Sequence, residues 1–424
     1  MNLCRKNSNR HDLNSSIDAI VLANLDNDTI RSVEIREGAV NENFSEIKTY
    51  KIRWYILLVI CLINISNAIN GFCYTSIADF TGRFYSVDYT QVNLLSTISM
   101  VIIVPAGFIS FIIIDYFGIR SSLIIAGLLN FFGTIFSVLS SVKQANNSPL
   151  IQIDQKYSIL MTGQVFCSIA TPFSFLVTTK FANTWFSPNQ RALANTIALV
   201  SATFGVLIGA LVSPLIVNSE TEFGDQMSTL NSTNCVISLV PAVLSVLINR
   251  STPPTPPTQT IDCNEERLLL KFHETFCINL KQTVQLFKSI QFLILFFTFS
   301  ICFGLFNTLA ILLQQMLCVK GYTDQDVGIF SGIMIGLGII GSLVAGVIVD
   351  KTKRFEEVAK ICFSVSSLAN LFFAAFQSYN NDEGLIKNII ISAFCIIGIS
   401  GLPLLPVRKL SESWFFKFHK NSSS

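Results

Sequence analysis

The chain has 424 residues, of which 51% are hydrophobic and 13% are charged, with a formal net charge of +2 at pH 7 and a mean hydropathy of +0.55. A surface this apolar excludes a water-soluble globular protein, so we expect much of it to face lipid. The near-neutral charge gives no indication of nucleic-acid binding, and we predict no nucleic-acid partner.

Hydrophobic stretches recur from Trp54 almost to the end of the sequence. Each is long enough to cross a hydrocarbon layer of about 30 Å, which requires roughly 20 helical residues. We therefore predict an all-α polytopic membrane protein with about ten membrane helices. Their expected ranges are 54–74, 92–114, 121–142, 158–178, 195–217, 235–248, 290–315, 327–349, 358–376 and 388–407.

The distribution of Lys and Arg predicts the orientation of the chain. Residues 1–50 are polar and contain no pattern of a cleavable secretory signal, so the first helix is expected to direct insertion. Positive charges concentrate before this helix and in alternate loops, as they do on the cytosolic side of membrane proteins. They are Lys48, Lys51, Arg53, Arg120, Lys180, Arg191, Lys271, Lys281, Lys351, Lys353 and Arg354. We predict a cytosolic N-terminus.

Two Asn-x-Ser/Thr sequons bear on the same assignment. One begins at Asn146 and the other at Asn231, and both fall in loops predicted to face the lumen or the exterior. Both asparagines are therefore candidate glycosylation sites.

A polar segment divides the helices into two groups. We predict a six-helix bundle over residues 51–249, a cytosolic linker over 250–289, a partial bundle of about four helices over 290–407 and a cytosolic tail over 408–424. The linker begins with the run Ser251-Thr252-Pro253-Pro254-Thr255-Pro256-Pro257. This run is expected to be extended, because proline fixes φ and lacks an amide donor.

The second half of the linker has a different pattern. Hydrophobic residues recur there at helical spacing, at Leu269, Phe272, Phe276 and Leu280. This spacing predicts an amphipathic helix lying on the bundle or at the membrane interface. The alternative is an acidic dileucine sorting signal, formed by Glu265, Leu269 and Leu270, which would bind sorting adaptors.

Nothing in the sequence indicates catalysis. The histidines lie in the tails or the linker, at His11, His273 and His419. No triad, metal-ligand or phosphate-loop pattern falls within the predicted helices, so we predict no enzyme, no cofactor and no metal. The cysteines inside the helices are interpreted as small apolar residues that fill the core, with a bridge between Cys235 and Cys318 as the alternative.

A charged turn is repeated in the two halves of the chain. Asp115, Gly118 and Arg120 lie where a short cytosolic turn joins two predicted helices, and Asp350 with Lys353 follows the second helix of the second half. We interpret these residues as a conformational gate, because an ion pair at a helix end can hold one state of a moving protein. The alternative is ordinary charge at the membrane boundary.

The helix after the fourth predicted span shows a related pattern. It is preceded by Trp185-Phe186-Ser187-Pro188-Asn189-Gln190-Arg191-Ala192-Leu193-Ala194, in which Arg191 is a further gate candidate. Gly205 and Gly209 lie on one face of the helix, followed by Pro214. Small residues on one face allow close helix packing, and proline allows a kink.

Polar residues inside the first helix form a stripe. Asn64, Asn67, Asn70 and Tyr74 are three or four residues apart and so share one helical face. Polar groups facing lipid are unfavourable, so this face must meet protein, substrate or water. We retain both interpretations, substrate binding and interhelical hydrogen bonding, for this stripe and for Asn307 and Gln314.

Taken together, Asp-x-x-Gly-x-Arg with its second-half echo, Trp-Phe-x-x-x-x-Arg-Ala-x-Ala and the Gly/Pro pattern resemble the major facilitator superfamily. The nearer resemblance is to the feline leukemia virus subgroup C receptor family. It is carried by residues 50–54, 250–257, 312–318 and 349–355 and extends over roughly residues 50–406.

This resemblance implies a twelve-helix transporter that alternates between inward-open and outward-open states. It implies small organic cations or vitamins as substrates, such as choline, ethanolamine or pyridoxine, and haem has also been proposed. One branch of the family implies a lysosomal membrane and proton-driven export, so we expect the lysosomal or the plasma membrane.

The chain departs from the family at four positions. The family usually has tryptophan at Gly71, and its choline carriers have tyrosine at Asn307 and glutamine at Thr203. A choline-type aromatic box is therefore not expected, although Thr203 remains a substrate-binding candidate. Gln314 replaces an acidic residue of close relatives, and the predicted helices hold no buried carboxylate or histidine that supports proton coupling.

The end of the chain also departs from the family. Residues 401–407 resemble its tenth helix, but 408–424 do not continue the pattern, so the last two of the usual twelve helices are expected to be missing. Two functions are open. One is a secondary transporter of a small organic solute in the lipid bilayer, and the other is a truncated, non-transporting receptor, scaffold or regulatory isoform.

Overall fold

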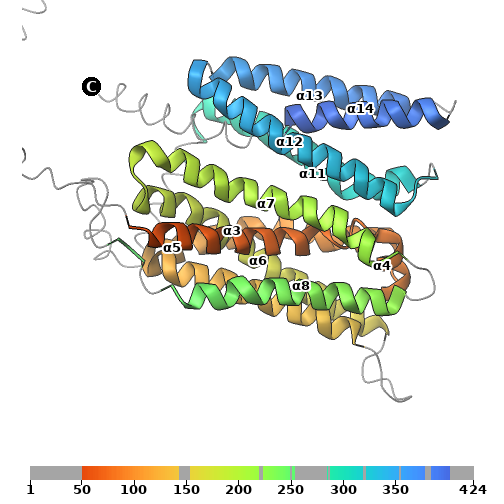
Figure 1. The fold of residues 1–424 in the computed structure, drawn as a ribbon, viewed down its shortest axis with the longest axis horizontal. Coiled ribbons are helices and arrows are strands. Elements are labelled where there is room, and N and C mark those ends of the chain that lie inside the picture. Colours follow the sequence, from red (N-terminus) through yellow and green to blue (C-terminus); the bar gives the residue numbers. More distant parts are fainter. Residues whose placement is uncertain are drawn as a thin grey trace, which may run out of the picture. The chain divides into compact units, whose positions relative to one another are not determined.

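The computed structural model describes residues 50–142, 153–218, 223–248, 251–253, 284, 287–318, 321–352, 355–377 and 383–401. Its helices, shown in Figure 1, all belong to one compact unit, residues 49–424. They are α3 (Ile52–Phe72), α4 (Ala78–Tyr85), α5 (Tyr89–Ser141), α6 (Ile153–Trp185), α7 (Pro188–Ile216), α8 (Phe223–Val246), α11 (Ile290–Cys318), α12 (Asp324–Thr352), α13 (Phe355–Gln377) and α14 (Glu383–Gly401).

The predicted fold class is confirmed, because every regular element in these ranges is helical. Among the described residues, seven helices are long and apolar enough to cross a membrane, and one of them is the 53-residue α5. Two shorter apolar helices follow at Lys360–Ala375 and Ile390–Gly401. Helix α5 covers two of the predicted spans.

Gly118 divides α5 into two membrane helices. Its backbone has φ 78° and ψ −176°, a conformation open in practice only to glycine. The hydroxyl of Ser122 donates to the Gly118 carbonyl at 2.9 Å, which stabilises the first turn after the break. The turn predicted between the second and third spans is therefore confirmed at this glycine.

Two predictions about the helices were wrong. Helix α8 begins at Phe223 rather than at residue 235. Its first half is polar, and threonine hydroxyls there donate hydrogen bonds to backbone carbonyls of the same helix. Thr229 donates to the Asp225 carbonyl at 2.9 Å, and Thr233 donates to the Thr229 carbonyl at 2.8 Å. Hydropathy alone does not identify so polar a segment as part of a membrane helix. The short helix α4 was missed because its sequence mixes polar and apolar residues.

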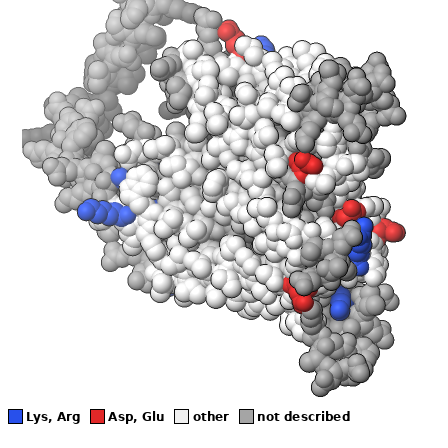
Figure 2. Space-filling view, turned by 45° about the vertical axis from the view of Figure 1, so that its right-hand side comes forward, with Lys and Arg blue, Asp and Glu red and all other residues white. Residues whose placement is uncertain are grey.

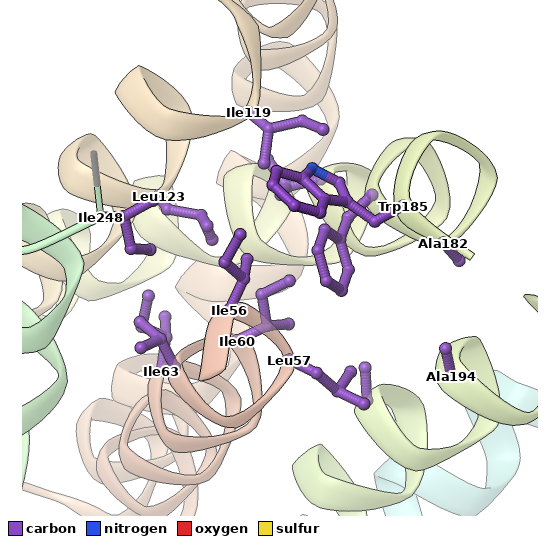
Figure 3. Packing of buried hydrophobic residues seen from close by; sticks show 14 of the residues in the cluster. Ile56, Leu57, Ile60, Ile63, Ile119, Leu123, Ala182, Trp185, Ala194 and Ile248 are labelled. Carbon is purple, nitrogen blue, oxygen red and sulfur yellow. The ribbon is translucent and has the colours of Figure 1, made fainter. Parts of the chain in front are cut away.

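The helices α3 to α8 share an apolar core. Figure 3 shows part of it, with Ile56 and Ile60 of α3 near Leu123 of α5 and Trp185 of α6. Helices α5 and α6 cross closely where two glycines meet, since a Cβ on Gly163 would lie 2.5 Å from the carbonyl oxygen of Gly133. Small residues at such a crossing bring backbones together without lipid between them.

The helices α11 to α14 build a second core. Phe330 and Met334 of α12 are buried against Phe394 of α14. The backbone of Gly398 meets that of Met334, which forms a second close crossing. Val206 and Leu207 of α7 also contact this core, so α7 is the helix that joins it to the first one.

The outward faces of the helices are apolar. Leu371, Phe297 and Ile301 have exposed fractions of 68%, 58% and 60%. Figure 2 shows one face of the molecule on which uncharged residues cover most of the described surface, with charged side chains mostly toward its margins. This distribution is that of a protein surrounded by hydrocarbon.

The glycine crossing of α5 and α6 gives a first test. Gly163→Ala should destabilise the protein by about 1–3 kcal/mol, because the added methyl group meets backbone and not a mobile side chain. Gly336→Ala is the matched control, since no atom lies within 4 Å of its Cβ position. Thermal unfolding in detergent measures both. Equal melting temperatures for the two variants would contradict the crossing.

Candidate functional site

Asn67 of α3 joins three helices. Its side-chain amide donates to the Cys167 carbonyl of α6 at 2.8 Å and to Asn130 Oδ1 of α5 at 3.2 Å. Its own Oδ1 accepts a hydrogen bond from the hydroxyl of Thr171 at 2.8 Å. Asn67 is only half-buried, so it keeps surface for a further contact.

Asn130 is the centre of this network, and the sequence did not single it out. Its Oδ1 accepts from Asn70 at 3.4 Å as well as from Asn67, and its Nδ2 donates to Ser66 Oγ at 2.8 Å. Asn70 also donates to Ser238 Oγ of α8 at 3.2 Å. An isolated asparagine in an apolar stretch gives no periodic signal, so only the packing of the helices reveals its role.

Tyr74, the last residue of the polar stripe, belongs to a second group of buried, hydrogen-bonded side chains. Its hydroxyl donates to Asn231 Oδ1 at 2.7 Å, and Asn231 Nδ2 donates to the Ser137 carbonyl at 2.9 Å. The hydroxyl of Tyr85 lies 2.8 Å from Ser140 Oγ. Burial raises the pKa of Tyr85 to about 12, so this hydroxyl stays protonated.

The placement of Asn231 in an exterior loop was wrong. It lies within α8 with an exposed fraction of 0%, and its amide nitrogen is already engaged by the contacts above. A glycan attached to that nitrogen has no space in this fold. The other sequon, at Asn146, lies outside the described residues.

The other polar candidates on the membrane helices are more dispersed. Asn64 is buried and donates to the Ala198 carbonyl of α7 at 2.9 Å. Asn307 donates to the Phe303 carbonyl of its own helix at 2.8 Å, and Thr203 is half-buried on α7. Gln314 has an exposed fraction of 1%, and its amide lies 3.2 Å from Cys318 Sγ.

Among the described residues, no disulfide joins Cys61, Cys73, Cys167, Cys235, Cys318, Cys362 or Cys395. Cys73 and Cys167 are buried, as expected for small apolar residues in a core. The alternative bridge between Cys235 and Cys318 is therefore not formed.

The gate candidate Asp115 pairs with a cation on a neighbouring helix. Asp115 is bound by Lys180 of α6, with 2.8 Å between Nζ and Oδ1, and not by Arg120. Lys180 also donates to the Ile114 carbonyl at 2.9 Å. Sequence reasoning named no partner for Asp115, because Lys180 lies 65 residues away on another helix. Because both partners belong to α5 and α6, this ion pair links neighbouring helices of the first core.

Two further arginines lie at this end of the helices, which we call the Gly118 end. Arg191 donates from Nε to the Phe186 carbonyl at 3.0 Å. Arg53 is buried, with its guanidinium 4.9 Å from the ring centre of Phe186 and 5.6 Å from that of Trp54. Such cation–π contacts stabilise a cation that has left water.

Several predicted features lie outside the described residues. They are the side chains of Asp350 and Lys353, the linker helix, the sorting pattern Glu265, Leu269 and Leu270, and the tail 408–424. The repeat of the charged turn in the second half therefore stays a prediction.

The opposite end holds a contact between the two cores. Asn93 of α5 donates to Gln315 Oε1 at 3.0 Å, and Gln315 Nε2 of α11 donates to Asn93 Oδ1 at 2.8 Å. Asn93 lies on the same helix segment as Gly118, about 38 Å away at 1.5 Å per residue. We call this the Asn93 end. Sequence reasoning missed this reciprocal pair, because 222 residues separate its members.

Helix α7 meets neighbours on two sides through small residues. A Cβ on Gly205 would lie 2.5 Å from the Ile65 carbonyl oxygen of α3, and a Cβ on Gly209 would lie 3.4 Å from Ile69 Cα. On the other side, a Cβ on Gly328 of α12 would lie 3.4 Å from Pro214 Cγ. The glycines and proline predicted to allow close packing therefore lie at helix crossings.

Comparison with known proteins identifies the family. The profile of the Major Facilitator Superfamily matches residues 60–407. Solute carrier family 49 member A3 of Xenopus tropicalis is 30% identical over 87% of this chain and 72% of its own length. The chain belongs to the major facilitator superfamily and, within it, to solute carrier family 49. It is thus an integral, multi-pass membrane protein of a transporter family.

More distant relatives agree with this assignment. The choline/ethanolamine transporter FLVCR2 of Rattus norvegicus is 24% identical over 80% of this chain and 60% of its own length. Among solved structures, the xylose transporter XylE from E. coli in a partially occluded inward-open conformation matches with a TM-score of 0.61. It is 14% identical and covers 86% of this chain and 88% of its own, so it supports the fold alone.

The polar network gives a second test. Asn130→Leu should lower the free energy of unfolding by about 1–3 kcal/mol, because it removes the acceptor that the Asn67 and Asn70 amides share and the donor to Ser66 in an apolar interior. Asn307→Leu is the control, since it removes a bond to its own helix and should change stability by less than about 0.5 kcal/mol. Thermal unfolding in detergent compares them. A stable Asn130 variant would show that the network does not hold the helices.

Proposed function

We propose that the chain is a secondary transporter that carries a small organic solute by alternating access. The observation that carries the proposal is the Asn93–Gln315 pair, which joins the two cores at one end of the molecule. Alternating access requires contacts that close one end and break when the other end closes. The transporter names of the relatives support the same reading.

The chemistry of the pair suits a reversible contact. Two hydrogen bonds between neutral amides contribute roughly 0.5–1.5 kcal/mol each, which thermal motion and substrate binding can overcome. Both side chains are half-buried, so water can replace the bonds once the end opens. An ion pair at this position would be harder to separate in a low-dielectric setting.

The proposed substrate is a vitamin such as pyridoxine or a small amine related to choline and ethanolamine. No atom lies within 4 Å of a Cβ built on Gly71, where the family usually has tryptophan. Open space at this position favours a solute held by amide and hydroxyl groups over one held by an aromatic ring. Asn67, Thr203 and Asn307 are the proposed contacts, since each keeps some exposed surface.

The proposed orientation places the N-terminus and the Gly118 end in the cytosol. Lys180, Arg120, Arg191 and Arg53 all belong to this end, as the enrichment of positive charge on the cytosolic side requires. The Asn93 end then faces the lumen of a lysosome or the exterior of the cell. Labelling of single cysteines from either side of sealed vesicles tests this orientation.

The transport assay is the direct test of function. The purified full chain in liposomes should take up at least one of pyridoxine, choline or ethanolamine with saturable kinetics. Solute binding without uptake would instead favour the non-transporting receptor or regulatory alternative. Failure to bind or move any of the three would overturn the substrate proposal.

Crosslinking tests the role of the Asn93 end. Asn93→Cys combined with Gln315→Cys, once oxidised, should reduce uptake at least tenfold, because the bridge prevents this end from opening. Reduction by dithiothreitol should restore uptake, and each single variant treated with the same oxidant is the control. Unchanged uptake by the crosslinked protein would show that this end does not open during transport.

Gly71→Trp tests the substrate interpretation. A ring in this open space should raise the affinity for choline by about tenfold, since a desolvated cation–π contact contributes up to about 2 kcal/mol. Gly304→Trp is the matched control, because its Cβ position is also open but lies on an exposed part of α11. Choline binding is measured by calorimetry. Equal affinities for both variants would argue against a substrate cavity beside Gly71.

A further inference from the structure

Three sequence motifs meet at one residue, Ser251. They are the charged turn around Gly118, the aromatic end of α6 and the start of the proline-rich run. The Arg120 amide of the turn donates to Ser251 Oγ at 3.3 Å, and the indole of Trp185 donates to the Ser251 carbonyl at 3.2 Å. The beginning of the linker is thus bound to the turn through its side chain and its backbone.

The hydrogen bond from the Arg120 amide to Ser251 caps the N-terminus of a helix. The helix after the break starts at Ile119, and its first amides have no acceptor within the helix. A serine or threonine usually caps such an end from the residue before the helix, where this chain has Gly118. Ser251 supplies the missing oxygen from 131 residues away.

The shape of the turn makes this contact specific. Gly118 has φ 78°, and a Cβ built on it would lie 3.3 Å from Ser251 Oγ. A side chain at position 118 would therefore be strained and would also press on the serine. Trp185 has an exposed fraction of 3%, so its indole is held in place by the core. We call these contacts of Ser251 the linker latch.

Thr252, the next residue, is more accessible than the half-buried Ser251. Thr252 is exposed, and Pro253 and Pro254 follow it in the sequence. An exposed threonine directly before proline is the substrate pattern of proline-directed protein kinases. We propose that Thr252 is a phosphorylation site and that its phosphate strengthens the linker latch.

The reaction needs only a nucleoside triphosphate and the kinase. The Thr252 hydroxyl oxygen forms a bond to the γ-phosphorus, the bond from that phosphorus to the bridging oxygen breaks, and the diphosphate leaves. The hydroxyl proton is released to the kinase base or to water. The product carries about −1.5 to −2 charges at pH 7.

The charges around the latch set the direction of the effect. The phosphate is held one residue from Ser251, beside the positive end of the helix that starts at Ile119. The side chain of Arg120 is exposed at the same turn and can pair with phosphate oxygens. Asp115, the carboxylate of this turn, is already neutralised by Lys180. The phosphate therefore draws the linker onto the turn and slows the opening of the Gly118 end.

This inference rests on the proposed cytosolic orientation of the Gly118 end, but its test does not require transport. The full chain in detergent is treated with a purified proline-directed kinase and MgATP, and the sites are mapped by mass spectrometry. Thr255→Val removes the neighbouring threonine-proline pair, so that Thr252 is observed alone. Thr252→Val is the control that cannot be modified.

Hydrogen exchange then measures the latch. Amide exchange in a peptide covering residues 118–122 should slow at least threefold when Thr252 is phosphorylated. Ser251→Ala should speed this exchange in the unmodified protein and remove the effect of the phosphate. Absence of phosphate on Thr252, or phosphate that leaves the exchange unchanged, would overturn the proposal. Failed solute uptake by the unmodified protein would count against the proposed function alone.

Discussion

The absence of water in the bilayer core determines how this chain is built. A polar group that faces hydrocarbon without a partner is unfavourable by several kcal/mol, so the polar side chains of the helices must bind one another. Asn67, Asn70 and Asn130 meet this requirement at the junction of four helices, α3, α5, α6 and α8. The same contacts place α3 at the centre of the first core.

The two ends of the molecule use different chemistry. At the Gly118 end, a charged pair between Asp115 and Lys180 and the cap from Ser251 hold neighbouring helices and the linker together. At the Asn93 end, a neutral amide pair and the crossing of α7 with α12 join the two cores. A charged contact thus lies within the first core, and the contacts between the two cores are uncharged. This arrangement suits a protein in which each core moves as a body.

Much of the fold could be predicted from the sequence, because hydrophobic length directly reports the need to cross lipid. The local hydrophobic pattern of the sequence predicts helices α3, α6, α7 and α11 and the turn at Gly118. The start of α8 could not be predicted in this way, since this segment is polar and its threonine hydroxyls donate to carbonyls of the same helix. The candidate site was harder to predict from the sequence. The partner of Asp115, the role of Asn130 and the Asn93–Gln315 pair all depend on contacts between distant segments. The family resemblance supplied the superfamily, which local pattern alone does not.

We propose that the two cores separate at the Asn93 end during transport. Spin labels at Leu94 of α5 and Ile329 of α12, both exposed, report the distance across this end by double electron–electron resonance in a background without reactive cysteines. We expect a short-distance population and a long-distance population, whose ratio changes when the transported solute is added. A single unchanged distance, in protein that transports solute, would contradict it.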